Sequence, residues 1–250
     1  MKREIYLPVL GIVVGELLIF IGHINVGLLL YIFNLQVISF VLIFRNIQIE
    51  IKKVLQSMIL LMVLRIISFI MPHFFGVTFF WLVLINGIMF IPIYLIIKNQ
   101  HISLSELGVN FKRPNIYLLL APFIGIIIAA LEYRILEPEG MMENLQYLNI
   151  VLIFIVMFVF VGPVEELIFR SILLTRLEKT IGIKNGLFLS AILFGIMHSS
   201  FGRFSEILIA VFFGLIIGYI FQKTRNFPVI LIINGTANMF LFGIFPILLK

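Results

Sequence analysis

The stretch VLIFIVMFVFVGPVEELIFR, residues 151–170, joins a long apolar run to two adjacent glutamates and an arginine. Residues 151–161 carry no charge, and Glu165, Glu166 and Arg170 follow directly. A run of this kind is typical of a bilayer span, which needs about 20 predominantly apolar residues. Ionisable side chains inside a span cost about 2.5–3.5 kcal/mol on insertion scales and are by default functional hypotheses. The stretch therefore predicts a membrane helix that carries a polar site.

The composition identifies the class of protein. Of the 250 residues, 62% are hydrophobic and only 12% are charged, whereas soluble domains are roughly 45–50% apolar. Such a chain cannot cover its surface with polar groups, so we expect an integral membrane protein whose surroundings are the lipid bilayer. The chain has no cysteine, which excludes disulfides, thiolate metal sites and a cysteine nucleophile. The net charge of +6 indicates basic cytoplasmic loops and no nucleic-acid binding.

Apolar segments recur along the whole chain. They span residues 5–22, 26–44, 54–71, 77–97, 117–131, 147–175, 186–200, 205–222 and 228–248. Alternating strand patterns separated by turn residues are absent, so the segments are helices and not barrel strands. The sequence predicts an all-α, polytopic membrane helix bundle with about eight transmembrane helices, drawn from eight or nine apolar segments. The fifth and seventh segments are short, and tilted or re-entrant helices are alternatives for them.

The longest polar stretch, residues 98–115, divides the chain into two parts. We expect it to form a loop or a short surface helix. Residues 1–115 then comprise N-terminal transmembrane helices and this cytoplasmic loop. Residues 116–250 form a second unit, whose motif-bearing helices span 147–248.

Lysine and arginine are distributed unevenly between the two sides of the predicted bundle. With a cytoplasmic N-terminus, the inner side collects Lys2, Arg3, Arg45, Lys52, Lys53, Lys98, Lys112, Arg113, Arg176, Lys179, Lys184, Lys223 and Arg225. The outer side keeps Arg134, Arg203 and Lys250. Because cytoplasmic loops are enriched in lysine and arginine, we predict a multi-pass protein of the cytoplasmic membrane with its N-terminus inside. The acidic stretch 132–146 is predicted to be an outer loop.

Three polar side chains on three different segments fall at similar depths in the membrane. A helix rises 1.5 Å per residue, and a basic residue at one end of each segment marks the inner surface. This count places Glu165 about 16 Å, His198 about 21 Å and Asn234 about 13 Å from that surface. Such a coincidence is expected if the three side chains line one intramembrane cavity.

Within each helix, the spacing of polar residues indicates which side chains share a face. Glu166 and Arg170 are four residues apart and can pair, which leaves Glu165 rotated away and free to face something else. Phe194 and His198, and likewise Asn234 and Asn238, have the same spacing. A carboxylate near an imidazole can hold and deprotonate a water molecule, and an amide can donate to an oxyanion. These are the parts of a hydrolase.

Structural roles are alternatives for most of these residues. The Glu166–Arg170 pair can be a structural ion pair, and the two asparagines can be interhelical hydrogen-bonding residues. Gly214 and Gly218 are spaced for close helix packing. Arg65 either pairs with an acid in the membrane or extends to the inner interface. Packing explains Glu165 together with His198 less easily, since both are ionisable and lie at matching depth.

The motifs resemble those of one family. EELIFR (165–170) is similar to the EExxxR motif, and FGIMH (194–198) to the FxxxH motif, of the CAAX-prenyl-protease and bacteriocin-processing family, also called CPBP or Abi. SLSELGV (103–109) resembles the loop that often precedes the family's core. The resemblance covers roughly residues 100–245 and implies a polytopic, α-helical, prokaryotic intramembrane endopeptidase with its catalytic core in residues 116–250. It also implies that Glu165 is the general base, that His198 holds the water, and that Glu166, Arg170 and Phe194 support the site.

The sequence departs from this family at its last motif. That motif usually reads HxxxN, whereas this chain has NGTAN (234–238), with Asn234 in place of the histidine and Asn238 retained. An amide is a poor zinc ligand. We therefore predict a metal-free mechanism without a cofactor, in which Asn234 and Asn238 join Glu165 and His198 as catalytic residues. Zinc remains the alternative, and Glu165 and His198 would then hold it.

Two functions are consistent with these observations. The first is an endopeptidase that cleaves a membrane-associated peptide or a prenylated, CAAX-type protein C-terminus, admitted from the cytoplasmic side. The alternative is a non-proteolytic Abi-type membrane protein that acts in bacteriocin self-immunity or as a regulatory scaffold. The intact Glu165 and His198 favour chemistry. A transporter is disfavoured because inverted repeats are not visible.

Overall fold

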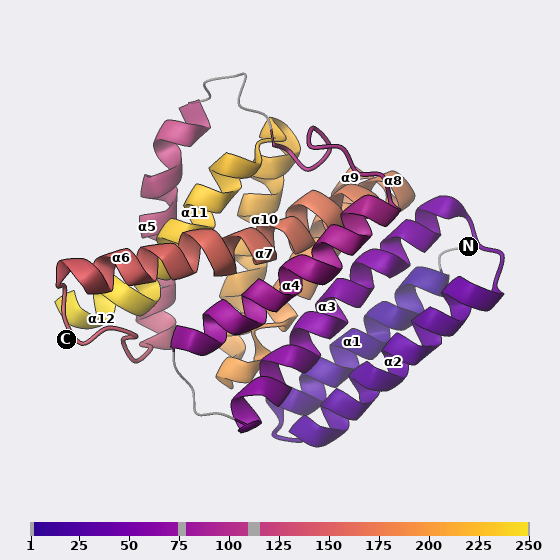
Figure 1. Cartoon of the computed structure of the whole chain (residues 1–250), viewed down its shortest axis with the longest axis horizontal. Helices are drawn as coiled ribbons and strands as arrows, with labels where there is room; N and C mark the ends of the chain where they lie inside the picture. Colours follow the sequence, from indigo (N-terminus) through magenta and orange to yellow (C-terminus); the bar gives the residue numbers. More distant parts are fainter. Residues whose placement is uncertain (1–2, 75–78, 110–115, 250) are drawn as a thin grey trace.

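The computed structural model describes residues 3–74, 79–109 and 116–249, and every regular element within these ranges is helical (Figure 1). The predicted all-α membrane bundle is confirmed. Of the predicted inner basic residues, Lys2, Lys112 and Arg113 lie outside the described ranges, as does Lys250.

Four long helices form the N-terminal part of the bundle. They are α1 (Arg3–Phe20), α2 (Ile24–Phe44), α3 (Ile49–Phe74) and α4 (Phe79–Asn99). Helix α3 contacts α1, α2 and α4, and it also packs against the C-terminal part of the chain. Its buried side chains recur every three or four residues from Ile51 through Leu55 and Met58 to Met62, which is the period of one helical face. The other helices of this part therefore assemble around α3.

The C-terminal part contains one long helix and two helix pairs. Residues 147–181 form a continuous helical rod of 35 residues, composed of α6 (Tyr147–Ile155), η1 (Val156–Val161), α7 (Gly162–Glu166), η2 (Leu167–Leu174) and α8 (Thr175–Ile181). The remaining elements are α5 (Ile116–Leu136), α9 (Ile183–Ile196), η3 (Ser199–Phe201), α10 (Phe204–Thr224), α11 (Phe227–Met239), η4 (Phe240–Ile244) and α12 (Phe245–Leu248). Helix α9 pairs with α10, and α11 pairs with α5.

Glycines bring the paired helices into close contact. A Cβ atom on Gly125 of α5 would lie 2.6 Å from the carbonyl oxygen of Ile233 in α11. A Cβ atom on Gly214 of α10 would lie 3.0 Å from Cα of Ala191 in α9, and one on Gly218 would lie 2.6 Å from Leu187 Cδ1. The expected packing role of Gly214 and Gly218 is therefore confirmed.

Seven of the nine apolar segments correspond to described helices that are long and apolar enough to cross a membrane. They span Ile24–Phe44, Ile49–Ile70, Phe79–Asn99, Ile116–Leu136, Tyr147–Ile181, Phe204–Thr224 and Phe227–Leu248. Helix α9 has only 14 residues, about 21 Å, so the seventh segment is short as predicted. The fifth segment extends to 21 residues. Helix α1 carries three charged residues in its 18 positions, which separates it from the seven.

The long rod widens on both sides of the two glutamates. Proline lacks an N–H group and its ring clashes with the carbonyl four residues earlier. Ahead of Pro163, the N–H of Gly162 donates to the carbonyl of Met157, five residues back. This π-helical hydrogen bonding accommodates the proline, and the helix continues. Gly162 also lies against α11, where an added Cβ would approach Leu231 Cδ1 to 3.0 Å. This close contact brings Glu165 and Glu166 next to α11.

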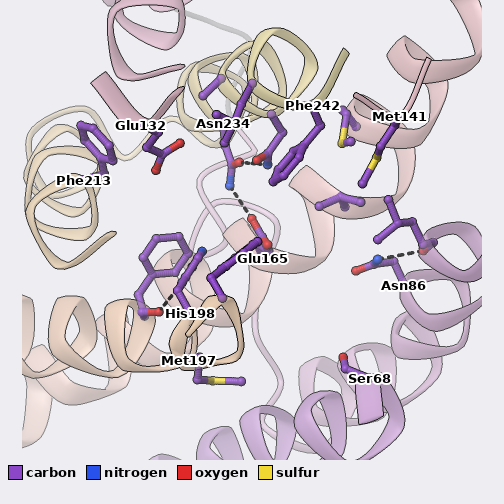
Figure 2. A pocket seen from close by; sticks show the side chains of 18 of the residues that line it. Ser68, Asn86, Glu132, Met141, Glu165, Met197, His198, Phe213, Asn234 and Phe242 are labelled. Atoms are coloured by element: carbon purple, nitrogen blue, oxygen red, sulfur yellow. Dashed lines mark hydrogen bonds between the residues drawn. The ribbon is translucent and has the colours of Figure 1, made fainter. Parts of the chain in front are cut away.

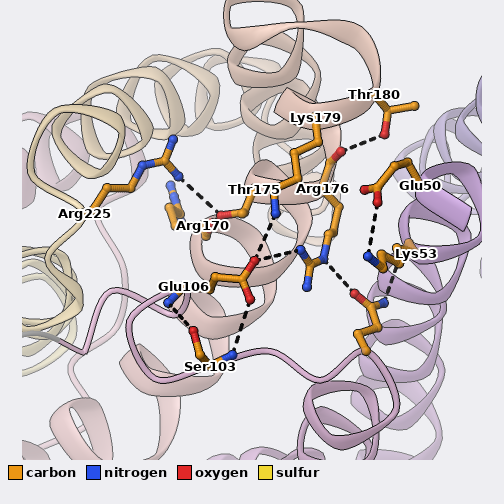
Figure 3. Close-up of polar contacts among 11 residues, drawn as sticks. Glu50, Lys53, Ser103, Glu106, Arg170, Thr175, Arg176, Lys179, Thr180 and Arg225 are labelled. Carbon is orange, nitrogen blue, oxygen red and sulfur yellow. Dashed lines mark hydrogen bonds and ion pairs between the residues drawn. The ribbon is translucent and has the colours of Figure 1, made fainter.

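In the polar stretch 98–115, the described residues after α4 form turns (Figure 3). Hydrogen bonds and an ion pair attach these turns to the end of the bundle that carries Arg176, Lys179 and Arg225, called the basic end below. The Ser171 hydroxyl donates to the carbonyl of Leu107 at 2.7 Å, and the N–H of Phe227 donates to the carbonyl of Gly108 at 2.8 Å. Lys179 Nζ lies 2.9 Å from Glu106 Oε1. The hydrogen bond from Lys179 lowers the pKa of Glu106, and partial burial opposes that shift.

Candidate active site

One cavity of about 800 Å³ lies inside the bundle, within the usual range of roughly 300–1,000 Å³ for ligand sites. The helices that contribute to it come from both parts of the chain (Figure 2). Its polar and charged lining consists of Arg65, Ser68, Asn86, Glu132, Glu139, Glu165, His198, Glu206, Asn234 and Asn238. The structure thus brings Glu165, His198, Asn234 and Asn238 together around one space, and Phe194 also lines it.

A chain of amide hydrogen bonds leads to Glu165. Asn238 Nδ2 donates to Asn234 Oδ1 at 2.6 Å, which orients the Asn234 amide. Asn234 Nδ2 then donates to Glu165 Oε2 at 3.0 Å and to Glu166 Oε1 at 2.6 Å. An amide NH₂ group has two donor hydrogens, so both are directed at carboxylates. Glu165 itself is half-buried and faces the cavity.

Glu166 and Arg170 form the predicted i,i+4 ion pair. Arg170 Nη1 lies 3.0 Å from Glu166 Oε1, and both side chains are almost completely buried. The guanidinium lies over the ring of Phe194, 4.2 Å from its centroid. Glu166 Oε2 and Arg170 Nη2 remain buried without a hydrogen-bond partner among the described residues. The pair joins the rod to α9 immediately beside the cavity.

His198 follows the end of α9 and faces the cavity from the side opposite Asn234 (Figure 2). Its Nδ1 atom lies 2.9 Å from the carbonyl oxygen of Phe194. A carbonyl only accepts hydrogen bonds, so Nδ1 carries the proton and Nε2 presents a lone pair. The Phe194 ring packs against the imidazole with centroids 4.9 Å apart. Phe194 therefore fixes both the ring orientation and the tautomer.

One protein-family model matches part of this chain. Residues 147–240 match the family model described as type II CAAX prenyl endopeptidase Rce1-like. This segment is an Rce1-like domain. The match contains EELIFR, FGIMH and NGTA, and begins at the first residue of α6. No curated protein and no solved structure matches the chain.

The N-terminal helices, which lie outside the Rce1-like domain, hold the turn that carries His198. Arg65 of α3 donates to the carbonyl of Met197 at 2.6 Å and to the Ser199 hydroxyl at 3.3 Å. Arg65 also forms a buried ion pair with Glu16 of α1, and Glu16 accepts hydrogen bonds from Ser199 and Tyr31. Of the two alternatives for Arg65, the structure shows pairing with an acid and not extension to the inner interface. These contacts are called the 197–199 clamp below.

Two further buried carboxylates line the cavity, and neither is among the site residues predicted from the sequence. Glu132 was assigned to an acidic outer loop, but it lies in the last turns of α5 and is buried, so that assignment is wrong. Glu206 occupies the first turn of α10. In a sequence, a carboxylate near the end of an apolar run resembles a loop residue. The direction of the Glu132 side chain follows from the packing of α5 against α11 and α10, which a single sequence does not reveal.

The exposed part of the cavity lining lies at the end of the bundle opposite the basic residues. It consists of Glu139, Gly140, Met141 and Phe201, located after α5 and in η3. Lys98 and Lys179 lie at the other end, with the 101–108 turns (Figures 1 and 3). The sequence predicts a cytoplasmic opening and a cytoplasmic basic end, whereas the exposed lining residues and the basic residues lie at different ends of the bundle.

The donor set does not fit a catalytic zinc site. Such sites have three protein ligands drawn from histidine, cysteine and carboxylates. Within residues 3–74, 79–109 and 116–249, no three such side chains converge on one point. Asn234, at the position where the related motif has histidine, directs its amide hydrogens at Glu165 and Glu166.

Proposed function

We propose that this protein is an intramembrane endopeptidase that hydrolyses a peptide bond in a membrane-associated or prenylated peptide, with Glu165 as the general base. The observation that carries the proposal is the placement of Glu165. Its carboxylate is oriented by Asn234 at 3.0 Å and shares one cavity with the lone pair of His198. The Rce1-like domain, which contains these residues, supports the choice of protease over other hydrolases.

The chemistry uses water as the nucleophile. A water molecule that donates one hydrogen to Glu165 and the other to His198 Nε2 has its lone pair directed at the carbonyl carbon of a bound peptide. Glu165 accepts a proton as the new C–O bond forms. When the tetrahedral intermediate collapses, the C–N bond breaks and Glu165 returns the proton to the leaving amine. The products are a carboxylate and an amine.

The two asparagines have different roles in this scheme. Asn234 directs both amide hydrogens at carboxylates, so it positions Glu165. Asn238 uses one amide hydrogen on Asn234, and its second hydrogen has no partner among the described residues. We assign the oxyanion donor to Asn238, since a preorganised donor contributes about 2.7–4 kcal/mol to transition-state stabilisation.

No step of this mechanism requires a metal ion. Dialysis against a chelator should therefore leave the activity unchanged, and elemental analysis should find no stoichiometric zinc. Activity that is lost in the chelator and restored by added zinc would contradict the mechanism, although it would leave the peptidase function intact.

The chain is a multi-pass membrane protein, and we propose that it resides in the cytoplasmic membrane with the basic end inside. Lysine and arginine at that end favour this orientation, and the cavity then opens outward. The cysteine-free sequence permits a direct test in intact cells with a membrane-impermeant maleimide. Glu139→Cys should be labelled, whereas Lys179→Cys should be labelled only after lysis. The reverse pattern would place the cavity mouth in the cytoplasm.

The function itself is tested with purified protein in detergent and a library of apolar peptides whose cleavage is read by mass spectrometry. Wild type should cleave a subset, and Glu165→Gln and His198→Ala should each cleave none while keeping wild-type melting temperatures. Full activity in Glu165→Gln would refute the assigned base. A wild-type protein that binds peptides but cleaves none would favour the non-proteolytic alternative, an immunity or scaffold protein.

A further inference from the structure

Two buried carboxylates of the cavity have no role in the proposed hydrolysis. Glu132 of α5 is 9% exposed and Glu206 of α10 is 1% exposed. Both line the same cavity as Glu165. In Figure 2 the carboxylate of Glu132 lies between Phe213 and Asn234 and points to the interior of the cavity. The two side chains come from neighbouring helices and face one region of that space.

Neither carboxylate makes a hydrogen bond or an ion pair within the described part of the chain, and Glu206 Oε2 is buried without a hydrogen-bond partner. Arg203, three residues before Glu206, donates to the backbone carbonyl of Ile135 at 2.5 Å, and its charge acts on Glu206 only at longer range. Buried carboxylates are normally paired with a cation or a donor, because desolvating an unpaired charge is costly. Two unpartnered carboxylates beside a cavity therefore indicate a cation that enters it.

The charges around the cavity strengthen this inference. Glu132, Glu139, Glu165 and Glu206 contribute four carboxylates to the lining. The lining cation Arg65 is already neutralised by Glu16. Among the described lining residues, acidic side chains therefore outnumber the cationic ones around Glu132 and Glu206.

The surroundings of Glu132 and Glu206 fit a cationic amino-acid side chain better than a metal ion. No three carboxylate or histidine groups converge on one point in the described residues. Apolar side chains, including Ile128, Phe213 and Ile217, line the cavity beside the acids. Lysine and arginine have long apolar stems that pack on such surfaces while the charged group reaches a carboxylate.

We propose that Glu132 and Glu206 form a subsite for a lysine or arginine side chain of the peptide substrate. This proposal extends the peptidase function, because it specifies which peptides the cavity accepts. A free C-terminal carboxylate placed at the same point would be repelled. The subsite therefore favours substrates with an internal basic residue near the scissile bond.

The test measures peptide binding in a Glu165→Gln background, where no cleavage occurs. Two terminally blocked, fluorescent apolar octapeptides are compared, one with a central lysine and the other with norleucine, which has a similar length and no charge. We expect the lysine peptide to bind about tenfold more tightly or better, as charge-assisted hydrogen bonds allow. Adding Glu132→Gln and Glu206→Gln should reduce that ratio to about one.

Glu143→Gln, an exposed change in the same region, is the matched control and should keep the preference. Equal affinity of the two peptides, or an unchanged ratio in the double variant, would overturn the subsite. If the double variant does not fold, the subsite is tested by the affinities of the two peptides for the Glu165→Gln protein and for its two single variants, Glu132→Gln and Glu206→Gln. If the protein prefers the lysine peptide but the wild type cleaves no peptide, the subsite is supported and the peptidase function is contradicted. If the wild type cleaves peptides but shows no lysine preference, the peptidase function is supported and the subsite is contradicted.

Discussion

Arg170 lies in one of the most completely buried parts of the bundle, between the Glu166 carboxylate and the ring of Phe194. Its removal leaves a buried carboxylate with no cation, which costs about 3–5 kcal/mol. Arg170→Ala should therefore lower the melting temperature and the yield as well as the activity. Arg134→Ala, a change at an exposed position of α5, is the control and should leave all three near wild type. Wild-type stability in Arg170→Ala would show that the pair is not buried in the membrane.

Asn234 acts through Glu165, so its loss should affect turnover more than binding. Asn234→Ala removes the donors that orient both carboxylates, and misplacing a catalytic group by about 1 Å can cost about 10²-fold in rate. We expect kcat to fall by about that factor with KM little changed. Asn86→Ala is the control, since Asn86 lines the cavity but donates to Leu82 in its own helix. An Asn234→Ala enzyme with full turnover would reduce Asn234 to an interhelical hydrogen bond.

At the scale of single residues, the sequence predicts correctly which side chains within one helix contact each other, because helical periodicity determines these contacts. The i,i+4 pairs Glu166–Arg170, Phe194–His198 and Asn234–Asn238 all make contacts. Contacts between helices follow from packing that a single sequence does not reveal. The bond from Asn234 to Glu165 joins residues 69 positions apart, and it gives Asn234 a partner other than the oxyanion expected from sequence.

The N-terminal helices contribute to the site through the 197–199 clamp. Arg65→Met leaves Glu16 buried without a cation, so stability should fall by about 3–5 kcal/mol. Replacing both residues, Glu16→Leu with Arg65→Met, should restore most of the stability, because apolar replacement of a buried pair is often neutral. Activity should remain low in both variants, because Met197 and Ser199 lose the contacts that hold the turn of His198.

Tyr31→Phe is the matched control for the clamp, since it removes one hydrogen bond to Glu16 and keeps the ion pair. It should cost only about 0.5–1.5 kcal/mol and preserve activity. A double variant that regains stability together with full activity would show that α1 and α3 only support the fold.

Element boundaries were predicted well where apolar runs are long and uniform. The sequence alone does not reveal that π-helical turns accommodate Pro163 within a continuous helix. The clamp could not be predicted, since Glu16 lies in an apolar helix with no local partner and Arg65 lies 49 residues away. The sequence indicates only that Glu16 and Arg65 each need a partner, because burying an unpaired charge is costly.

At the scale of the whole molecule, the basic end is stabilised by charge pairs around Glu106. Its pKa is lowered from 4.5, so the charged form favours the folded state. This contribution is present above pH 4.5 and is lost as the pH falls through the lower folded pKa. Glu106→Gln should therefore have a lower melting temperature than wild type at neutral pH, and the difference should disappear in acid. An unchanged difference down to pH 3 would contradict the pairing with Lys179.

The central claim is that Glu165 activates water to cleave a peptide bond inside the membrane. The most direct measurement is cleavage by the reconstituted protein in water enriched in ¹⁸O, with mass analysis of the first turnover. One ¹⁸O atom should appear in the new carboxyl group of the N-terminal fragment, and Glu165→Gln should yield no fragment. A wild-type product without ¹⁸O, or labelled product from Glu165→Gln at the wild-type rate, would contradict the mechanism.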